Sequence, residues 1–172
     1  MIAITRRTAL VLAAVGFFAI AIATSSKADP ADGTASGTLT VNGQTVQVAY
    51  AYARQVPGFF DANSMDTKVI VSDVPLDAAA LGDEFARSDL ADAGKLHAFE
   101  ITIDASGTPV STAWRHNGFK GPQPSGLSSA DVFVKSVLDD KVVAGSYKSA
   151  EAAEFFGNTY SFDVTFRAAI AH

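Results

Sequence analysis

The sequence predicts an all-β fold, an antiparallel β-sandwich of about eight strands with one helical crossover insertion. One observation is Asn42-Gly43 between two runs rich in β-branched residues, a dipeptide that suits the two-residue type I′ turn of a hairpin. Another is the stretch over residues 159–170, in which polar residues alternate with Tyr160, Phe162, Val164, Phe166, Ala168 and Ile170. This alternation is typical of a strand with one buried and one solvated face. A small closed β-barrel is the alternative arrangement of the same strands.

Residues 1–28 have the three parts of a secretory signal peptide. Arg6 and Arg7 precede an apolar run over residues 9–23, and Ser26 and Ala28 are small residues suited to a cleavage site. The apolar run is short for a membrane span, which needs about 20 residues. The arginine pair also resembles the twin-arginine export signal, so the general and the twin-arginine routes both stay open. We therefore expect cleavage after Ala28 and a periplasmic or secreted location.

The composition limits how the mature chain is stabilised and what it binds. The chain has no cysteine, so neither a disulfide framework nor a cysteine-linked lipid anchor is available. Cleavage removes 3 of the 13 Lys and Arg residues, so 10 remain against 18 Asp and Glu, a net charge of −8. We expect an acidic, soluble protein of this kind to bind no nucleic acid and to make no stable membrane insertion after signal cleavage.

The mature chain is expected to form a flexible lead over residues 29–36 and a single domain over residues 37–172. Runs of β-branched, aromatic and alternating residues predict its strands, and Pro, Gly, Asn and Asp mark the turns between them. The predicted strands cover residues 38–41, 44–53, 68–72, 95–103, 108–116, 131–138, 141–147 and 159–170. Most of the connections are short, so we expect mainly antiparallel hairpins.

Residues 76–93 interrupt the strands with a helical pattern, since the segment is rich in Ala, Leu, Asp and Glu. Asp77 is placed to cap the first turn and Gly94 to end the last one. Gly82 and Ser88 weaken the middle of the segment, so one helix and two short helices are both compatible with it. A further helical turn is expected around residues 150–155.

Two loops are rich in Pro and Gly, at residues 56–63 and 121–126. The first loop carries Phe59 and Phe60, and two adjacent phenylalanines are unusual in solvent. We expect the two rings to close one end of the core. An apolar lip on a binding site is the alternative.

The segment from Trp114 to Lys120 is the best candidate for a ligand-binding surface. It places the only tryptophan, Trp114, with Arg115, His116 and Lys120 where a strand runs into a loop. Aromatic and Arg side chains at such junctions often anchor ligands. Replacing Trp114 by alanine should then remove the ligand and leave the fold intact. The alternative is that Trp114 fills the core while the cations are solvated.

His97 and His116 are the candidate metal ligands. An even-length loop over residues 104–107 puts both imidazoles on one face of a hairpin, as cross-strand or diagonal neighbours. Such a pair can bind zinc or copper, with Glu100 or Asp73 as a third ligand. The alternative is that these are ordinary histidines with satisfied hydrogen bonds.

Linear motifs of catalysis are missing from the sequence. It contains no Gly-x-Ser-x-Gly elbow, glycine-rich phosphate loop, zinc-protease helix or calcium loop. We therefore assign no catalytic residue and expect no cofactor apart from the zinc or copper alternative. An enzyme whose site leaves no linear motif is a third hypothesis.

Four segments resemble small secreted bacterial proteins of unknown function: Gly37–Gly43, Tyr50–Ala53, Gly94–His97 and Tyr160–Phe166. The resemblance implies a signal peptide followed by one β-rich domain, and it implies no activity and no site residue. Together with the residues, it leads us to expect an exported, non-enzymatic β-sandwich that binds a small molecule or another envelope protein. A periplasmic metal-binding protein is the alternative function.

Overall fold

The computed structural model describes residues 33–172, so the predicted signal peptide and residues 29–32 lie outside the described range. Within this range the chain forms ten strands and two short helices. In chain order these are β1 (Thr34–Val41), β2 (Gln44–Gln47), β3 (Tyr50–Pro57), β4 (Met65–Ser72), α1 (Ala78–Gly82), α2 (Glu84–Asp92), β5 (Ala98–Ile103), β6 (Pro109–Arg115), β7 (Val132–Leu138), β8 (Val142–Lys148), β9 (Ala153–Phe155) and β10 (Asn158–Ala171).

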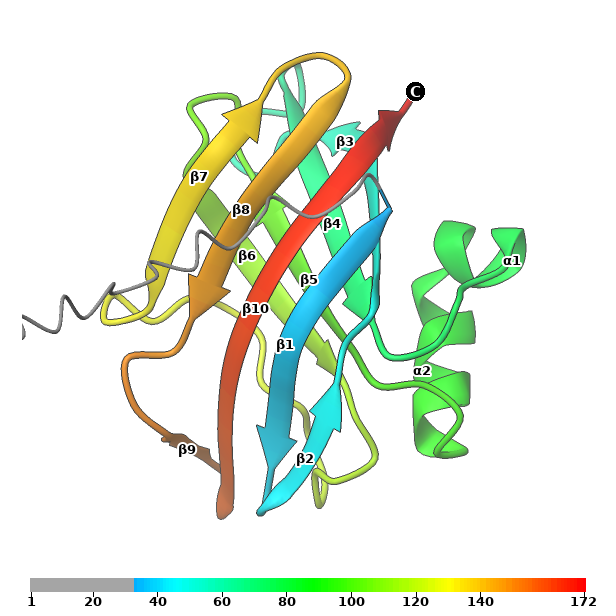
Figure 1. Cartoon of the computed structure of the whole chain (residues 1–172), viewed down its shortest axis with the longest axis vertical. Coiled ribbons are helices and arrows are strands. Elements are labelled where there is room, and N and C mark those ends of the chain that lie inside the picture. Colours follow the sequence, from blue (N-terminus) through cyan, green and yellow to red (C-terminus); the bar gives the residue numbers. More distant parts are fainter. Residues whose placement is uncertain (1–32) are drawn as a thin grey trace, which may run out of the picture.

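The strands form one sheet that curls into two facing layers (Figure 1). The strand order is β6-β5-β4-β3-β1-β10-β8-β7, with β2 added to β1 and β9 added to β10. In Figure 1, β1, β10, β8 and β7 lie in front of β3, β4, β5 and β6. Neighbours along this path are antiparallel, so the predicted all-β antiparallel fold with a helical crossover is confirmed. The two layers are continuous where β1 meets β3, and they end at β6 and β7.

β10 runs through the front layer and supplies much of its buried face. β1 pairs with one side of β10 and β8 with the other. The residues of the predicted apolar parity point inward, with Tyr160 packed against the buried side chains of Phe162, Val164, Phe166, Ala168 and Ile170. Across the core, the ring centroid of Phe99 on β5 lies 4.5 Å from that of Phe162. A shift of one residue in the pairing of β10 would expose these rings, so the core specifies the register.

The first hairpin has the predicted tight turn. Asn42 and Gly43 have φ angles of 50° and 80°, as a type I′ turn requires. The side-chain amide of Asn42 donates hydrogen bonds to Asn158 Oδ1 and to the Gly118 carbonyl, which ties the turn to the start of β10 and to the loop after β6. In β1, Gly37 has a φ of 115°, and a Cβ there would overlap a backbone carbonyl of β10. The strands therefore approach too closely at this point for any side chain.

The helical segment forms two short helices on the outside of the back layer (Figure 1). Asp77 caps α1 as predicted, and Asp83 caps α2 in an extended conformation that breaks the segment after Gly82. Gly94 follows the end of α2 with a φ of 67°, which is the expected helix stop. The segment encloses a second small core made of Ile70, Leu76, Ala80, Leu96 and Ala98. Neither helix of residues 33–172 is long and apolar enough to cross a membrane.

Two local predictions are changed by strand pairing. β1 begins at Thr34, so residues 34–36 of the expected flexible lead are paired with β10. Residues 153–155 of the expected helical turn form β9, which pairs with the start of β10. In both segments, sheet neighbours that are distant in sequence override a weak local preference.

The prediction that Phe59 and Phe60 close the core is wrong. Their side chains are 59% and 83% exposed, and their rings contact each other with centroids 5.0 Å apart. The buried carboxylate of Asp66 accepts a hydrogen bond from the Phe59 N–H and holds the loop over the start of β4. The two rings are therefore exposed to solvent at one end of the molecule.

Candidate functional site

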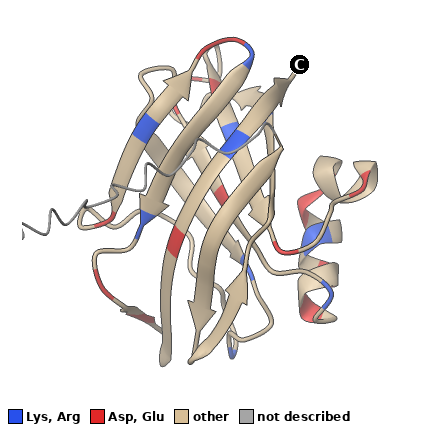
Figure 2. Cartoon of the chain, viewed as in Figure 1, with Lys and Arg blue, Asp and Glu red and all other residues tan. Residues whose placement is uncertain are grey.

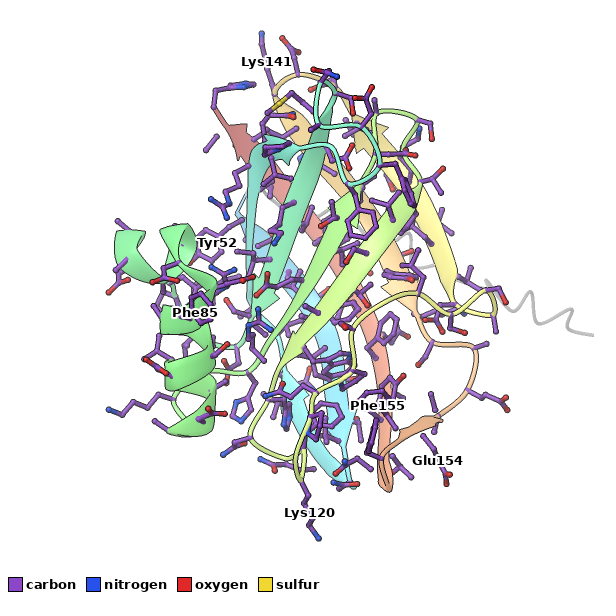
Figure 3. All side chains as sticks on the ribbon, turned by 180° about the vertical axis from the view of Figure 1, so that it is seen from behind. Tyr52, Phe85, Lys120, Lys141, Glu154 and Phe155 are labelled. Atoms are coloured by element: carbon purple, nitrogen blue, oxygen red, sulfur yellow. The ribbon has the colours of Figure 1, made fainter. Side chains whose placement is uncertain are left out.

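The structure separates the residues of the predicted ligand-binding surface. Trp114 points into the core and is 2% exposed, whereas Arg115 points outward and lies 3.7 Å from Glu84 of α2. His116 is fully buried on the same side as Trp114. Lys120 follows in the next loop and points away from the lower tip of the molecule (Figure 3). Because adjacent strand residues face opposite sides of a sheet, these four side chains do not converge on one pocket.

The two candidate metal ligands do lie together. The ring centroids of His97 and His116 are 4.5 Å apart. His97 Nδ1 lies 2.7 Å from Asp73 Oδ2, and its Nε2 lies 3.0 Å from Asn117 Oδ1. His116 Nδ1 accepts a hydrogen bond from the Gly118 N–H, so the ring proton is on Nε2. That Nε2 is buried and has no hydrogen-bond partner among the described residues.

This pair provides two imidazoles but not a full set of metal ligands. Of the two predicted third ligands, Asp73 contacts His97, whereas Glu100 lies on the outer face of the sheet in contact with two arginines. Among residues 33–172, no group of three His, Cys, Asp or Glu side chains is placed to hold a metal ion. Metal binding at His97 and His116 stays a prediction.

The buried imidazole predicts a loss of stability in mildly acidic solution. Burial, with the neighbouring His97, lowers the pKa of His116 to about 4, against a smaller opposing effect of Asp73. In the unfolded chain a histidine has a pKa near 6.5, so the unfolded state binds the proton first. Stability from this group is therefore complete above about pH 6.5 and falls toward pH 4 by about 1.4 kcal/mol per pH unit. Urea denaturation at several pH values between 7 and 5 measures this slope.

Two single variants assign the slope to a residue. His116→Gln should remove it, because the side chain no longer titrates. His172→Gln, at the exposed C-terminus, should leave it unchanged. A slope that persists in His116→Gln would assign the effect to another group.

A buried ion-pair cluster lies between α2 and the outer face of the sheet. Arg87 of α2 forms a bidentate pair with Glu100, with Nε 2.9 Å from Oε1 and Nη2 3.0 Å from Oε2. Arg115 and Lys68 lie 3.2 Å and 3.6 Å from the same carboxylate. Burial alone would raise the pKa of Glu100, but the hydrogen bonds from Arg87 and the three positive charges outweigh it and hold the pKa below its ordinary value. The carboxylate is therefore ionised and shared among three cations.

An apolar groove of about 360 Å³ lies beside this cluster, between α1 and the sheet. We call it the α1 groove. Figure 3 shows Tyr52 of β3 between the helices and the sheet on this side of the molecule. The volume lies within the range of roughly 300–1,000 Å³ that is usual for small-molecule sites. The walls come from α1 and from three strands, and they consist of Gly33, Ala51, Tyr52, Ala53, Arg54, Lys68, Ile70, Leu81, Ala169 and Ala171.

Two cations face each other on one wall of the α1 groove. Arg54 of β3 and Lys68 of β4 are direct partners in the sheet register, an arrangement in which like charges repel. Arg54 Nε is buried and has no hydrogen-bond partner within residues 33–172. The adjoining cluster adds two arginines and two glutamates, so this wall is positive although the whole chain has a net charge of −5. In Figure 2 most of the strand surface carries no charge, whereas the helical segment beside the groove carries both signs.

The α1 groove was missed by the sequence analysis. Arg54 follows directly after the predicted strand over residues 44–53, and Lys68 begins the next predicted strand. Pairing these strands as a hairpin would have placed the two cations side by side. The apolar pattern of residues 76–93, however, does not indicate which strands the helices cover. No pattern in the sequence therefore predicts the groove itself.

No family model, curated protein or solved structure matches this chain. Its function therefore has to be inferred from the chemistry of its own sites.

Proposed function

We propose that the protein is an exported, non-enzymatic binding protein that holds a small amphipathic molecule with an anionic head group in the α1 groove. The observation that carries the proposal is an apolar space with two facing cations, Arg54 and Lys68, on its wall. A hydrocarbon chain among the alanines would leave water, which contributes about 0.8 kcal/mol per CH₂ group. A carboxylate or phosphate at the cations would provide the acceptor that Arg54 Nε lacks and would relieve their repulsion.

Export to the periplasm or the medium is part of this proposal. It is supported by the signal-peptide pattern of residues 1–28. In that setting a binding protein without catalytic motifs would carry or sense its ligand. Another envelope protein that inserts an acidic, apolar segment into the α1 groove is the competing occupant.

Binding of a fatty-acid series to the purified mature protein tests the proposal. The affinity should rise about four-fold per added methylene group from octanoate to dodecanoate, because each methylene is buried in the groove. Arg54→Gln should weaken dodecanoate binding by about ten-fold or more, because a charge-assisted hydrogen bond is lost. Uncharged dodecanol should bind the variant and the wild type equally. Isothermal titration calorimetry measures all of these affinities.

A matched pair of phenylalanine substitutions on β10 tests the location. Ala169 and Thr159 are both exposed on the outer face of β10, but only Ala169 lines the α1 groove. Ala169→Phe should therefore abolish dodecanoate binding, and Thr159→Phe should not. Equal binding by both variants would place the ligand elsewhere. A folded protein that binds no fatty acid would favour the envelope protein as partner.

Metal binding by His97 and His116 is the second candidate function. It is favoured by the closeness of the two imidazoles, whose ring centroids lie 4.5 Å apart. Calorimetric titration with zinc and with copper separates it from lipid binding. Saturable binding that disappears when both histidines are replaced by alanine would support it, and no heat of binding would exclude it.

A further inference from the structure

A second, smaller cavity lies between the two layers, under the loop that joins β6 to β7. It encloses about 100 Å³ and is closed on one side by residues 124–128. Its other walls are four aromatic side chains, one hydroxyl and one carboxylate, from Trp114, Phe155, Tyr160, Phe162, Thr112 and Asp131. We call it the Trp114 cavity. It lies on the inner side of the sheet, whereas the α1 groove lies on the outer side, so the two are separate sites.

The rings of the Trp114 cavity meet nearly at right angles. The indole of Trp114 lies 5.4 Å from the ring of Tyr160 and 6.0 Å from that of Phe162 between centroids, with interplanar angles of 77° and 72°. Perpendicular rings form adjoining walls of a box instead of a closed stack. Figure 3 shows Phe155 at the lower end of the sheet, where β9 brings it toward this box. A cation within about 6 Å of such ring faces is attracted by their quadrupoles.

Asp131 supplies a negative charge beside these rings. The ion pairs of the described residues do not include it. Burial raises the pKa of Asp131, while hydrogen bonds from the Ala150 and Ser128 amides oppose the shift. After burial, the charge of Asp131 is the second cause that raises the pKa of Tyr147 to about 12 and that raises the pKa of Tyr160. The carboxylate therefore lines the same cavity as the aromatic rings and has no ion-pair partner among residues 33–172.

We propose that the Trp114 cavity binds a small methylated ammonium group, such as the head group of choline, with its methyl groups against the rings and its charge beside Asp131. The aromatic walls suit methyl groups better than a bare metal cation, which requires several oxygen ligands. A neutral group of the same shape would leave the carboxylate uncompensated. The volume, comparable to about three water molecules of roughly 30 Å³ each, limits the bound part to a head group of this size.

The fluorescence of Trp114 reports on this cavity directly, because Trp114 is the only tryptophan in the chain. The purified mature protein is titrated with choline, with tetramethylammonium and with 3,3-dimethylbutan-1-ol, the uncharged isostere of choline. Both cations should give a saturable change, with choline binding roughly ten-fold more tightly than the alcohol. Equal affinity for choline and the alcohol, or no saturable response to either cation, would overturn the proposal.

Variants of the carboxylate and of one ring complete the test. Asp131→Asn should weaken choline binding about ten-fold, and Tyr160→Leu about three- to ten-fold. Asp163→Asn, an exposed acid on β10, is the matched control and should have no effect. Unchanged choline affinity in a folded Asp131→Asn variant would also overturn the proposal. If that variant does not fold, the comparison of choline with its neutral isostere in the wild type still decides. Arg54→Gln should leave choline binding unchanged, which separates this site from the α1 groove.

Discussion

Replacing Glu100 with glutamine is expected to destabilise the protein by about 3–5 kcal/mol. The change leaves the fully buried guanidinium of Arg87 without its counter-charge, in a position under α2 where water does not reach it. Arg115 and Lys68 lose the same partner, but their side chains are 14% and 22% exposed and are partly solvated. Guanidinium denaturation followed by the fluorescence of Trp114 measures the loss.

Two further variants test whether the stability lost in Glu100→Gln comes from the unpaired buried charge of Arg87 or from the loss of an ordinary contact. Glu84→Gln removes a 57% exposed partner of Arg115 and should lower the free energy of unfolding by less than about 1 kcal/mol. The double variant with leucine at positions 87 and 100 replaces the pair by apolar side chains and should recover much of the stability lost in Glu100→Gln. If Glu100→Gln is as mild as Glu84→Gln, the Arg87 pair does not have the buried geometry described above.

Trp114→Ala is expected to lower the free energy of unfolding by about 3–5 kcal/mol. The substitution opens a cavity among the rings of Phe99, Phe119 and Phe162, which contact the indole at centroid distances of 5.1, 5.5 and 6.0 Å. The ligand-binding hypothesis predicted an intact fold for this variant, whereas the burial of the ring predicts the opposite. Because the variant lacks the fluorophore, denaturation is followed by circular dichroism.

Two milder substitutions serve as controls for the loss of unfolding free energy in Trp114→Ala. Trp114→Phe keeps an aromatic ring in the core and should be clearly less destabilising. Lys120→Ala changes an exposed loop residue and should stay within about 0.5 kcal/mol of the wild type. A Trp114→Ala variant as stable as the Lys120→Ala variant would show that the indole is not part of the core.

Most of the strands, the first hairpin and the helix ends could be predicted from the sequence. These features depend on neighbours a few residues apart: the alternation along β10, the positive φ tolerated by Asn42 and Gly43, and the cap at Asp77. The closeness of His97 and His116 could be predicted in the same way, because the register of one hairpin follows from the length of its loop.

Which residues share a site depends on how distant segments of the chain pack together. The position of α1 over β3 and β4 created the groove beside Arg54 and Lys68, and the position of α2 buried Arg87 against Glu100. The curl of the sheet turned Trp114 inward, away from Lys120, and toward the rings of β10. These outcomes depend on contacts between segments that lie tens of residues apart, and no periodicity within one segment specifies them.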